Sequence, residues 1–324
     1  MKESTQAADC CQEKIALSKK LGTQTARAKG RNSGKQRGET ILVKAFDFVK
    51  YHGLGNDFVL VDNRVDDRLW TAEEARIVCD RHRGIGGDGL ILVQRSDVAA
   101  LRMVIYNADG SRPEMCGNGL RCFARYVREI EMVAEDTFSV ETDRGVLACT
   151  IHREEDDNIE GIRVDMGEPI LERAKIPMQG DAPRCIEEAL TVEERTYHLS
   201  GISMGNPHAV IFKAADARDL VLAPQLEGHP LFPQRTNVEF VKQLSATHFD
   251  VVVYERGCGF TQACGTGACA VAVAAILTER AEADREIRVD LPGGSLWITV
   301  PSDLSTVWMR GPATFVFSGR WETR

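Results

Sequence analysis

Two short segments carry the residue types best suited to chemistry. Each reads Cys-Gly-x-Gly and runs directly into an apolar, helix-forming stretch: Cys116-Gly117-Asn118-Gly119 and Cys264-Gly265-Thr266-Gly267. At a helix N-terminus, the unpaired backbone N–H groups and the positive end of the helix dipole stabilise a thiolate. The cysteines lie 264 − 116 = 148 positions apart. This repetition indicates a duplicated unit with one reactive thiol in each half.

Several uses of these cysteines stay open on the residues alone. Thiols of low pKa oxidise readily, which fits a redox pair or a peroxide sensor. A nucleophilic cysteine would need a base such as His52 or His208, whereas acid–base catalysis at carbon would use one thiolate and one thiol on opposite faces of a stereocentre. Packing is the remaining use, because cysteine is often a small buried hydrophobe. The repeated glycines count against packing alone, since they bare backbone N–H groups that can bind a carboxylate.

The cysteines do not have the pattern of a disulfide framework or of a zinc site. The chain has ten cysteines in 324 residues, whereas disulfide frameworks are typical of small secreted domains. Neither Cys116/Cys122 nor Cys264/Cys269 has the Cys-x2-Cys spacing of zinc ligands. On a helix, five or six steps also leave two side chains well apart around the axis. We therefore expect reduced thiols and no bound metal.

Composition bounds the class of protein. With 43% hydrophobic and 27% charged residues the chain is typical of soluble globular proteins, and 324 residues predict two domains. The formal net charge of −8 argues against nucleic acid as a partner. No apolar run approaches the ~20 residues that span a membrane, and no continuous apolar core of a secretory signal opens the chain. We expect neither a nucleic-acid nor a membrane partner.

Residues 1–45 differ from the rest of the chain. They are rich in basic and hydroxyl-bearing residues and contain no aromatic residue, so they cannot bury enough apolar surface to fold alone. This composition predicts a disordered extension. A transit peptide is the alternative, although Glu3, Asp9 and Glu13 count against it because transit peptides are poor in acids.

One glycine-rich segment resembles a dinucleotide-binding motif but has the wrong context. A capping box at 71–74 predicts a helix to about His82, and Gly84-Ile85-Gly86-Gly87-Asp88-Gly89 leads from it into a strand. A dinucleotide site needs the order strand, glycines, helix. The observed order is the reverse, so we expect a tight turn and no NAD cofactor.

From Phe46 onward the pattern predicts two halves, each with many short strands around one cysteine-started helix. The first of these helices is expected to reach about Glu129 and the second about Arg280. The second is alanine-rich and small on nearly every side, which suits a position wrapped by a sheet. One last strand is expected over 306–317. The other strands are predicted near 46–51, 58–62, 90–93, 102–106, 138–142, 146–151, 161–165, 209–212, 236–241, 250–257, 286–290 and 296–300, with one more that ends near Met204.

Taken as a set, the motifs resemble those of the diaminopimelate epimerase family, over nearly everything from Phe48 to about Gly319. Seven motifs in one order are far more specific than any one of them. They are His52-Gly53-Leu54-Gly55-Asn56-Asp57-Phe58, Asn107-Ala108-Asp109-Gly110-Ser111, Met115-Cys116-Gly117-Asn118-Gly119, Gly205-Asn206-Pro207-His208, Thr236-Asn237-Val238-Glu239-Phe240, Glu255-Arg256-Gly257 and Ala263-Cys264-Gly265-Thr266-Gly267.

The resemblance implies an α+β fold of two pseudo-symmetric domains, each a β-barrel-like mixed sheet around a central helix. The first domain would comprise 46–165 with the C-terminal strand 308–324, and the second 166–307. The implied activity is the interconversion of LL- and meso-diaminopimelate in lysine biosynthesis, by an isomerase that uses no pyridoxal phosphate or other cofactor. The small-molecule substrate would lie between the domains. We expect a cytoplasmic homodimer, or a plastid stromal one if 1–45 is a transit peptide.

The resemblance also implies roles for individual residues. Cys116 and Cys264 would be the two catalytic bases, one accepting and one donating a proton in each direction. The N–H groups of four residues would meet the α-carboxylate at the two helix N-termini. These four residues are Gly117, Asn118, Gly265 and Thr266.

Side chains around the thiols would hold the rest of the substrate. Arg256 suits the distal carboxylate, because a guanidinium binds a carboxylate bidentately, and Glu255 suits an ammonium. His208 would orient site groups. The polar ends of the substrate would contact four asparagines, Asn56, Asn107, Asn206 and Asn237.

Two points qualify the resemblance. A two-cysteine racemase of proline or hydroxyproline is the nearest rival, but it would have no use for Glu255-Arg256 and the additional asparagines. The chain also departs from the family at Gly89, where some members have Gln, which leaves that substrate contact open.

Overall fold

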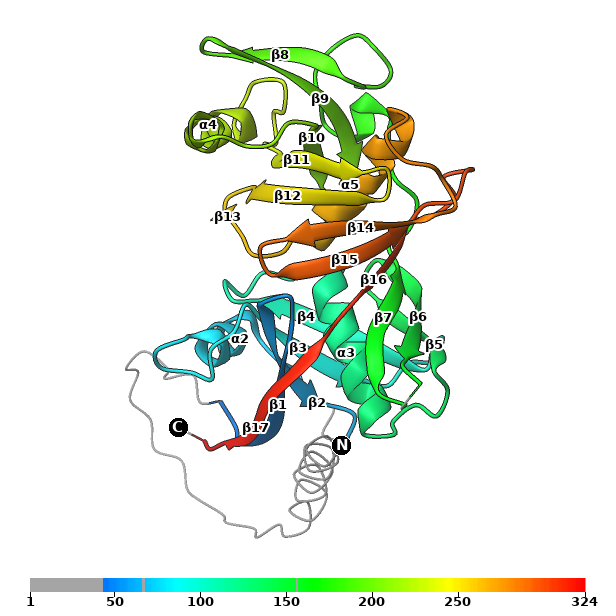
Figure 1. Ribbon diagram of the computed structural model, residues 1–324. Helices are drawn as coiled ribbons and strands as arrows, with labels where there is room; N and C mark the ends of the chain where they lie inside the picture. Colours follow the sequence, from blue (N-terminus) through cyan, green and yellow to red (C-terminus); the bar gives the residue numbers. More distant parts are fainter. Residues whose placement is uncertain (1–42, 66–67, 156, 324) are drawn as a thin grey trace, which may run out of the picture.

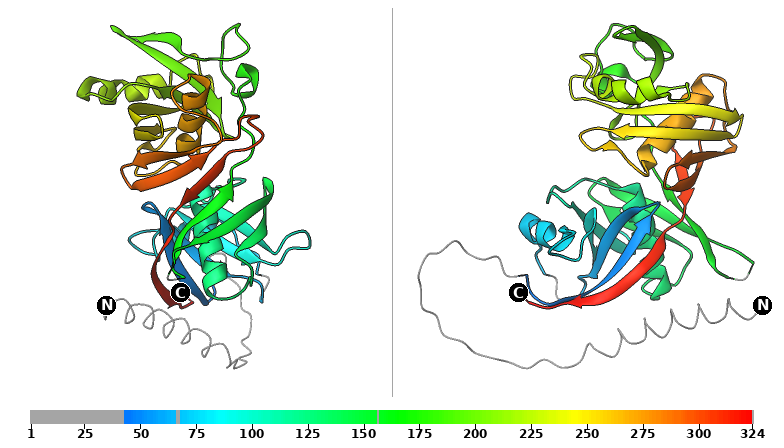
Figure 2. Two further views of the ribbon diagram at one scale, coloured as in Figure 1. Left: turned by 45° about the vertical axis from the view of Figure 1, so that its right-hand side comes forward. Right: turned by 60° about the vertical axis from the view of Figure 1, so that its left-hand side comes forward.

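The computed structural model describes residues 43–65, 68–155 and 157–323, so residues 1–42 of the predicted extension lie outside the described residues. Figures 1 and 2 show two domains, one above the other, joined by strands that run between them. Core packing begins earlier than the expected start at Phe46. Val43 is only 2% exposed and joins the hydrophobic cluster that contains Phe46 and Trp70.

The first domain is a mixed sheet curled around one helix. Its neighbouring strands alternate between antiparallel and parallel pairing, with β1–β2 and β3–β4 antiparallel and β2–β3 and β4–β5 parallel. Strands β5, β6 and β7 continue antiparallel, and β17 pairs with β1. The strands are β1 (Phe46–Gly53), β2 (Asn56–Asp62), β3 (Gly89–Gln94), β4 (Leu101–Asn107), β5 (Thr137–Thr142), β6 (Gly145–Arg153), β7 (Ile159–Asp165) and β17 (Thr314–Trp321).

The second domain repeats this scheme. Here β9–β10 and β11–β12 are antiparallel, β10–β11 and β12–β14 are parallel, and β14, β15 and β16 continue antiparallel. Strand β8 pairs with β9 as β17 pairs with β1. The strands are β8 (Glu188–Val192), β9 (Arg195–Ser203), β10 (Pro207–Ile211), β11 (Asn237–Ser245), β12 (His248–Glu255), β13 (Gly259–Phe260), β14 (Glu286–Leu291), β15 (Gly294–Thr299) and β16 (Trp308–Gly311).

The helices occupy equivalent places in the two repeats. Helix α2 (Ala72–Cys79) follows β2 and α4 (Ala217–Glu227) follows β10, while α3 (Gly117–Glu129) follows β4 and α5 (Gly265–Leu277) follows β12 and β13. A short 3-10 helix, Arg173–Lys175, lies on the connection between the repeats. Two similar sets of strands with matching helices, joined through β16 and β7 into one 17-stranded sheet, confirm the predicted α+β fold of two pseudo-symmetric domains.

The cysteine-started helices are the centres of the two domains. Helix α3 contacts β1, β2, β3, β4, β6 and β7, and α5 contacts β9, β10, β11, β14, β15 and β16. The alanine-rich α5 is buried almost throughout, as its small side chains predict. It ends at Leu277 rather than near Arg280, because Thr278 caps the helix end and Glu279 takes a left-handed φ of 58°.

The C-terminal part forms two strands, so the expected single strand over 306–317 is wrong. Strand β16 pairs with both β15 and β7 and thereby joins the two domains, and β17 then continues beside β1. Pro312 lies between β16 and β17, where its missing N–H and fixed φ interrupt the ladder. The pairing of β17 with β1 fits the proposed place of 314–321 in the first domain, whereas β16, which the same proposal places there, pairs with strands of both domains.

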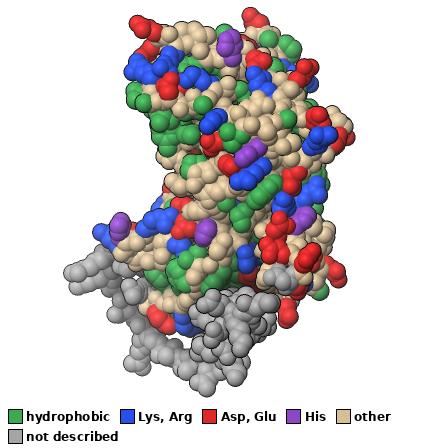
Figure 3. Space-filling model, in the orientation of Figure 1, with side chains coloured by type: hydrophobic (Ala, Val, Ile, Leu, Met, Phe, Trp, Pro, Cys, Tyr) green, Lys and Arg blue, Asp and Glu red, His purple; other side chains and the backbone are tan. Residues whose placement is uncertain are grey.

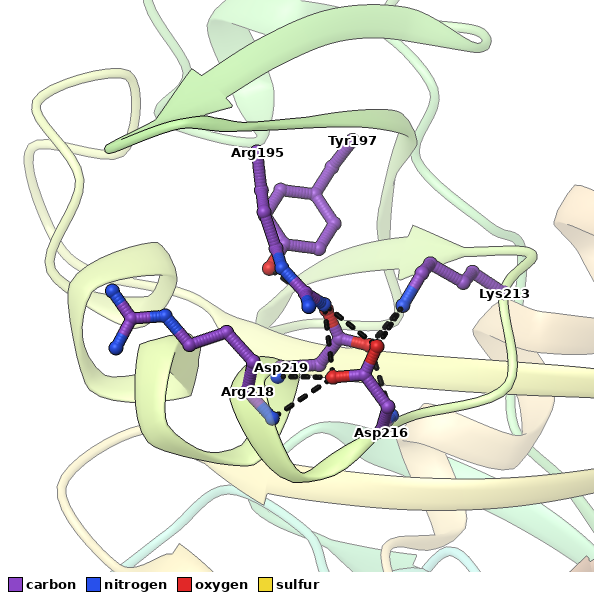
Figure 4. A network of polar contacts seen from close by, with 6 residues as sticks. All are labelled: Arg195, Tyr197, Lys213, Asp216, Arg218 and Asp219. Atoms are coloured by element: carbon purple, nitrogen blue, oxygen red, sulfur yellow. Dashed lines mark hydrogen bonds and ion pairs between the residues drawn. The ribbon is translucent and has the colours of Figure 1, made fainter.

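Of the two smaller helices, α2 has a clear sequence signal and α4 does not. At α2 the predicted capping box between Thr71 and Glu74 is present, although the helix ends at Cys79 rather than His82. The sequence pattern does not indicate helix α4, because Pro224 lies inside it and two of its buried residues, Asp219 and Glu227, are acids. Its first turn is held by the polar network of Figure 4, in which the buried Asp219 accepts hydrogen bonds from Arg195, Lys213 and Tyr197.

Within the described residues, none of the helices has both the length and the apolar character required to cross a membrane.

Candidate active site

Cys116 and Cys264 have the same backbone position in their repeats. Each is the N-cap residue of its helix, with φ/ψ of −138°/117° at Cys116 and −121°/104° at Cys264. In each case the carbonyl oxygen accepts the first helical hydrogen bond, at 2.8 Å from Leu120 N and 3.0 Å from Ala268 N. We call 116–119 the first helix mouth and 264–267 the second helix mouth.

The two helix mouths meet at the junction of the domains. A Cβ atom on Gly265 would lie 3.5 Å from Oδ1 of Asn118 in the opposite mouth. The side chain of Met309 in β16 lies against both mouths. A Cβ atom on Gly265 would be 3.2 Å from its Sδ, and a Cβ atom on Gly117 would be 2.7 Å from its Cε. Figure 3 shows the surface hollowed on the left between the two domains. The helices therefore point their N-termini, with their free N–H groups, toward one shared region.

The first mouth surrounds Cys116 with amide groups. The half-buried thiol lies 3.9 Å from Oδ1 of Asn56, which also accepts a hydrogen bond of 3.1 Å from Nδ2 of Asn118. Burial raises the pKa of the Cys116 thiol, while the N–H groups of Gly119 and Asn118 and the charge of Arg121 act to lower it. Asn56 and Asn118, two predicted substrate-binding residues, are thus brought to the thiol.

An ionic cluster beneath Asn56 fixes its orientation. Nδ2 of Asn56 donates to Oδ2 of Asp88 at 2.8 Å, so Oδ1 must face the thiol. Arg81 binds both Asp88 and Asp57, at 2.7 and 2.6 Å, and Lys50 binds Asp57 at 2.7 Å. Because a carboxylate only accepts hydrogen bonds, this cluster allows one orientation of the Asn56 amide.

Arg121 is a buried cation beside the first mouth. Its side chain is 0% exposed, and among the described residues no carboxylate pairs with it. Its guanidinium donates to Oδ1 of Asn118 at 2.9 Å and to the carbonyl of Pro312 at 3.2 Å. A buried charge without a counter-ion is costly, so a nearby anion would be strongly favoured.

The second mouth surrounds Cys264 with different chemistry. Cys264 is 4% exposed, and its Sγ lies 3.5 Å from Oγ1 of Thr266. Burial raises the pKa of the Cys264 thiol, and the charges of Glu255 and Glu239 raise it further, against the Thr266 hydroxyl and the N–H of Gly267. Acids therefore take the place that Arg121 has at the first mouth.

His208 connects the second mouth to its surroundings. Its Nδ1 lies 2.6 Å from Oε1 of Glu239, and its Nε2 lies 3.1 Å from Oδ1 of Asn206. Asn237 donates to the carbonyl of Pro207 at 3.1 Å. His208, Glu239 and Cys264 are the metal-type donors that cluster within 4.8 Å among the described residues. Both ring nitrogens of His208 have oxygen partners within the protein, Glu239 at Nδ1 and Asn206 at Nε2.

Glu255 and Arg256 follow at the end of β12. The backbone N–H of Arg256 donates to Oδ1 of Asn237 at 2.8 Å, and its exposed guanidinium donates to the carbonyl of Gln234 at 3.2 Å. Glu255 accepts a hydrogen bond of 2.5 Å from Thr261. Glu255 also raises the thiol pKa at both Cys116 and Cys264, which places its charge near both helix mouths.

Asn107 is the predicted site residue with the weakest link to the thiols. It ends β4, pairs with Gly89 of β3, and donates to Oγ of Ser111 at 2.9 Å. A Cβ on Gly89 would lie 2.7 Å from the carbonyl oxygen of Tyr106 and 3.2 Å from the Phe58 ring. Glycine at position 89 thus allows the close approach of neighbouring strands, and a Gln here would require the backbone to shift.

Sequence reasoning missed three charged residues of the site. Glu239 lies in the segment Thr236-Asn237-Val238-Glu239-Phe240, where the signal is an acid among the apolar residues of a buried strand. Arg121 has a similar signal, a cation between the apolar residues Leu120 and Cys122 of α3. The link from Asp88 to Asn56 joins segments far apart in the chain, so no local pattern could reveal it.

Comparison with known proteins identifies relatives that match most of the chain. The family model described as diaminopimelate epimerase matches residues 48–172 and 201–316. A diaminopimelate epimerase of Desulforudis audaxviator (strain MP104C) is 50% identical over 281 residues, covering 85% of this chain and 99% of the relative. A chloroplastic diaminopimelate epimerase of Oryza sativa subsp. japonica is 45% identical over 291 residues, covering 85% of this chain and 80% of the relative.

Solved structures share the fold at much lower identity. A Bacillus anthracis phenazine biosynthesis protein of the PhzF family has a TM-score of 0.63 at 16% identity, covering 86% of this chain and 99% of that one. A hydroxyproline epimerase from Agrobacterium vitis, with bound trans-4-hydroxy-L-proline, has a TM-score of 0.60 at 12% identity, covering 87% and 92%. At these identities the likeness concerns the fold alone.

Proposed function

This chain belongs to the diaminopimelate epimerase family, and on that premise we propose that it interconverts LL- and meso-diaminopimelate by proton transfer between two cysteines. The observation that carries the proposal is the paired position of Cys116 and Cys264. Both are N-cap residues of equivalent helices, and the two helix mouths meet at one junction. Such an isomerase supplies its own acid and base, so the proposal includes no cofactor.

The proposed reaction inverts one carbon centre. The thiolate of one cysteine removes the α-proton from one face, so that a C–H bond breaks and an S–H bond forms. The thiol of the other cysteine delivers its proton to the opposite face, and its electron pair stays on sulfur. Proton count and charge balance, and the reverse reaction exchanges the roles of Cys116 and Cys264.

The helix mouths would also stabilise the negative charge that develops during proton removal. The N–H groups of Gly117, Asn118, Gly265 and Thr266 lie in the first turns of the two helices, at the positive ends of the helix dipoles. An α-carboxylate bound there would accept hydrogen bonds that strengthen as the α-carbon becomes carbanion-like. Preorganised donors of this kind lower the barrier without reorganisation.

The distal half of the substrate would contact the polar side chains around the mouths. The exposed guanidinium of Arg256 has no carboxylate partner among the described residues, and it suits the distal carboxylate. Glu255 and the asparagines Asn56, Asn107, Asn206 and Asn237 would hold the ammonium and carboxylate groups. His208 would orient Asn206, with which it shares a hydrogen bond.

The direct test follows isomer composition and α-hydrogen exchange together. Purified, reduced protein is incubated with LL-diaminopimelate in deuterated water, and the isomers are separated and weighed by mass spectrometry. We expect meso product that carries one deuterium. Absence of both exchange and epimerisation would falsify the proposal, and exchange with proline or hydroxyproline instead would favour the rival racemase.

We also propose that the enzyme serves lysine biosynthesis, as a homodimer in the cytoplasm or, if 1–45 is a transit peptide, in the plastid stroma. The named chloroplastic relative in rice supports keeping the second location open. Rescue of a bacterium that lacks diaminopimelate epimerase tests the pathway. Light scattering of the eluting protein tests the dimer, and imaging of the full chain fused to a fluorescent protein decides the compartment.

A further inference from the structure

Glu239 is a buried acid that has no part in the proposed reaction. It lies in β11 with a side chain that is 0% exposed, and no Lys or Arg pairs with it among the described residues. Oε1 is hydrogen bonded to Nδ1 of His208 at 2.6 Å, but Oε2 has no hydrogen-bond partner. Burying a carboxylate with one oxygen unpaired destabilises a fold. Such a group is therefore expected to have a function.

The unpaired carboxylate lies beside the second thiol. Donor atoms of Glu239, His208 and Cys264 are within 4.8 Å of one another. A Cβ on Gly267 would lie 2.8 Å from Oε1 of Glu239 and 3.2 Å from Sγ of Cys264. Any other residue at position 267 would push the carboxylate and the thiol apart. The glycine of the Cys-Gly-x-Gly motif thus makes this close approach possible.

The charges at the two helix mouths have opposite signs. Cys264 lies near Glu239 of β11, Glu255 of β12 and His208 of β10, and a ring nitrogen of His208 is within 4.8 Å of the thiol. Cys116 faces the buried guanidinium of Arg121 on α3 as well as the shared Glu255. Like charges close together in a buried site disfavour ionisation of an acid, whereas a nearby cation favours it.

We propose that Glu239 is a positioning residue that keeps a proton on Cys264 in the resting enzyme, so that Cys116 is the resting thiolate. The inference rests on the proposed two-thiol reaction. Its consequence is an order of events. The resting enzyme accepts the isomer whose α-proton faces Cys116. After the reaction Cys116 carries the proton and Cys264 is the thiolate. Before a second turnover in the same direction, Cys116 must lose its proton to solvent and Cys264 must gain one.

The test measures the ionisation of each thiol without any substrate. Reduced protein is alkylated with iodoacetamide over a range of pH, and peptide mass spectrometry gives separate rates for Cys116 and Cys264. In the unmodified chain we expect the midpoint of the pH profile to be lower for Cys116 than for Cys264. The reverse order, or equal midpoints, overturns the proposal even if no variant folds.

The variant Glu239→Gln keeps the shape and removes the carboxylate, whose pKa is raised by burial and lowered by the charge and hydrogen bond of His208. We expect the Cys264 midpoint to fall by about one pH unit, which raises its alkylation rate near neutral pH about tenfold. The Cys116 midpoint should stay in place. An unchanged Cys264 profile in a folded Glu239→Gln protein overturns the proposal.

Two further variants separate charge from general damage. Glu239→Asp keeps a carboxylate and should keep the high Cys264 midpoint. Asp219→Asn removes another fully buried acid of the same domain, in the network of Figure 4, and should leave both midpoints unchanged; a shift equal to that of Glu239→Gln would contradict a specific role. Because these measurements use no substrate, a failure to epimerise diaminopimelate would refute the proposed function and leave the proton order standing.

Discussion

The two helix mouths are alike in backbone and different in charge. Cys116 and Cys264 cap equivalent helices with nearly the same φ and ψ, so the helix dipole and the free N–H groups act equally on both. The first mouth has the cation Arg121 beside it, and the second has the acid Glu239. Duplication thus explains why there are two similar sites, whereas single side-chain differences decide which thiol carries the proton.

The largest effect is expected from removing either thiol. Cys116→Ala and Cys264→Ala should each lower epimerisation by about 1,000-fold or more, because each removes an acid–base group that no neighbour replaces. Circular dichroism and thermal unfolding should match the unmodified protein. In deuterated water, each variant should still exchange the α-hydrogen on the face of its remaining thiol, so this measurement tests the two thiols separately. Full activity in either variant would rule out the two-base scheme.

A large and one-sided effect is expected at Arg121. Arg121→Met removes the cation near Cys116, so the Cys116 alkylation midpoint should rise by about one pH unit or more. The Cys264 midpoint should not change. The lost hydrogen bonds to Asn118 and Pro312 should also cost about 1–3 kcal/mol in urea unfolding. Arg121→Lys, which keeps the charge, serves as the control, and equal shifts at both thiols would contradict the comparison.

A smaller effect is expected at Asp88. Asp88→Asn offers the Asn56 amide a donor as well as an acceptor, so Asn56 can turn its Nδ2 toward Cys116. We expect kcat to fall about tenfold to 100-fold through misplacement of a site group, with little change in the Cys264 profile. Steady-state rates in both directions check this. Unaltered kcat would show that the ionic cluster serves folding only.

The smallest effect on chemistry is expected at Asp219. Burial acts to raise the pKa of Asp219, but hydrogen bonds from Lys213, the Asp216 N–H, Arg195 and Tyr197 outweigh it and hold the pKa below its ordinary value. The carboxylate therefore contributes stability above the unfolded pKa of about 3.9, and this is lost as the pH falls below it. Asp219→Asn should cost about 3 kcal/mol at neutral pH and flatten acid unfolding measured by fluorescence.

Local patterns predicted most of the fold. Strand alternation located nearly all the strands, and the alanine-rich stretch correctly indicated a helix wrapped by a sheet. The errors are at Pro312, where one expected strand became two, at α4, which contains Pro224 and two buried acids, and at β8 and β13, for which no strand was expected. These features depend on which partner a segment meets, and that information is not local.

In the candidate site, too, some features follow from local sequence patterns and others do not. Cysteine followed by Gly-x-Gly at a helix start is a local signal, and so the two helix mouths could be predicted. The contacts that distinguish the mouths, Arg121 to Asn118 and Glu239 to His208, depend on burial and on neighbours from other strands. A residue such as Glu239 becomes visible only when its unpaired oxygen and its distance from the thiol are known.

The order of strands along the chain has a consequence for synthesis on the ribosome. Strand β1 is made early but pairs with β17, which ends at Trp321, and β7 must wait for β16. The second domain lies between them in the sequence, so its strands β8 to β15 can assemble while the first sheet still has open edges. The helix beginning at Cys116 mainly contacts strands between β1 and β7, which are made before the second domain, so the parts that stay open are the edges of β1 and β7. Exposed edges during this interval can pair wrongly, which makes the first domain the part that most needs protection as the chain emerges.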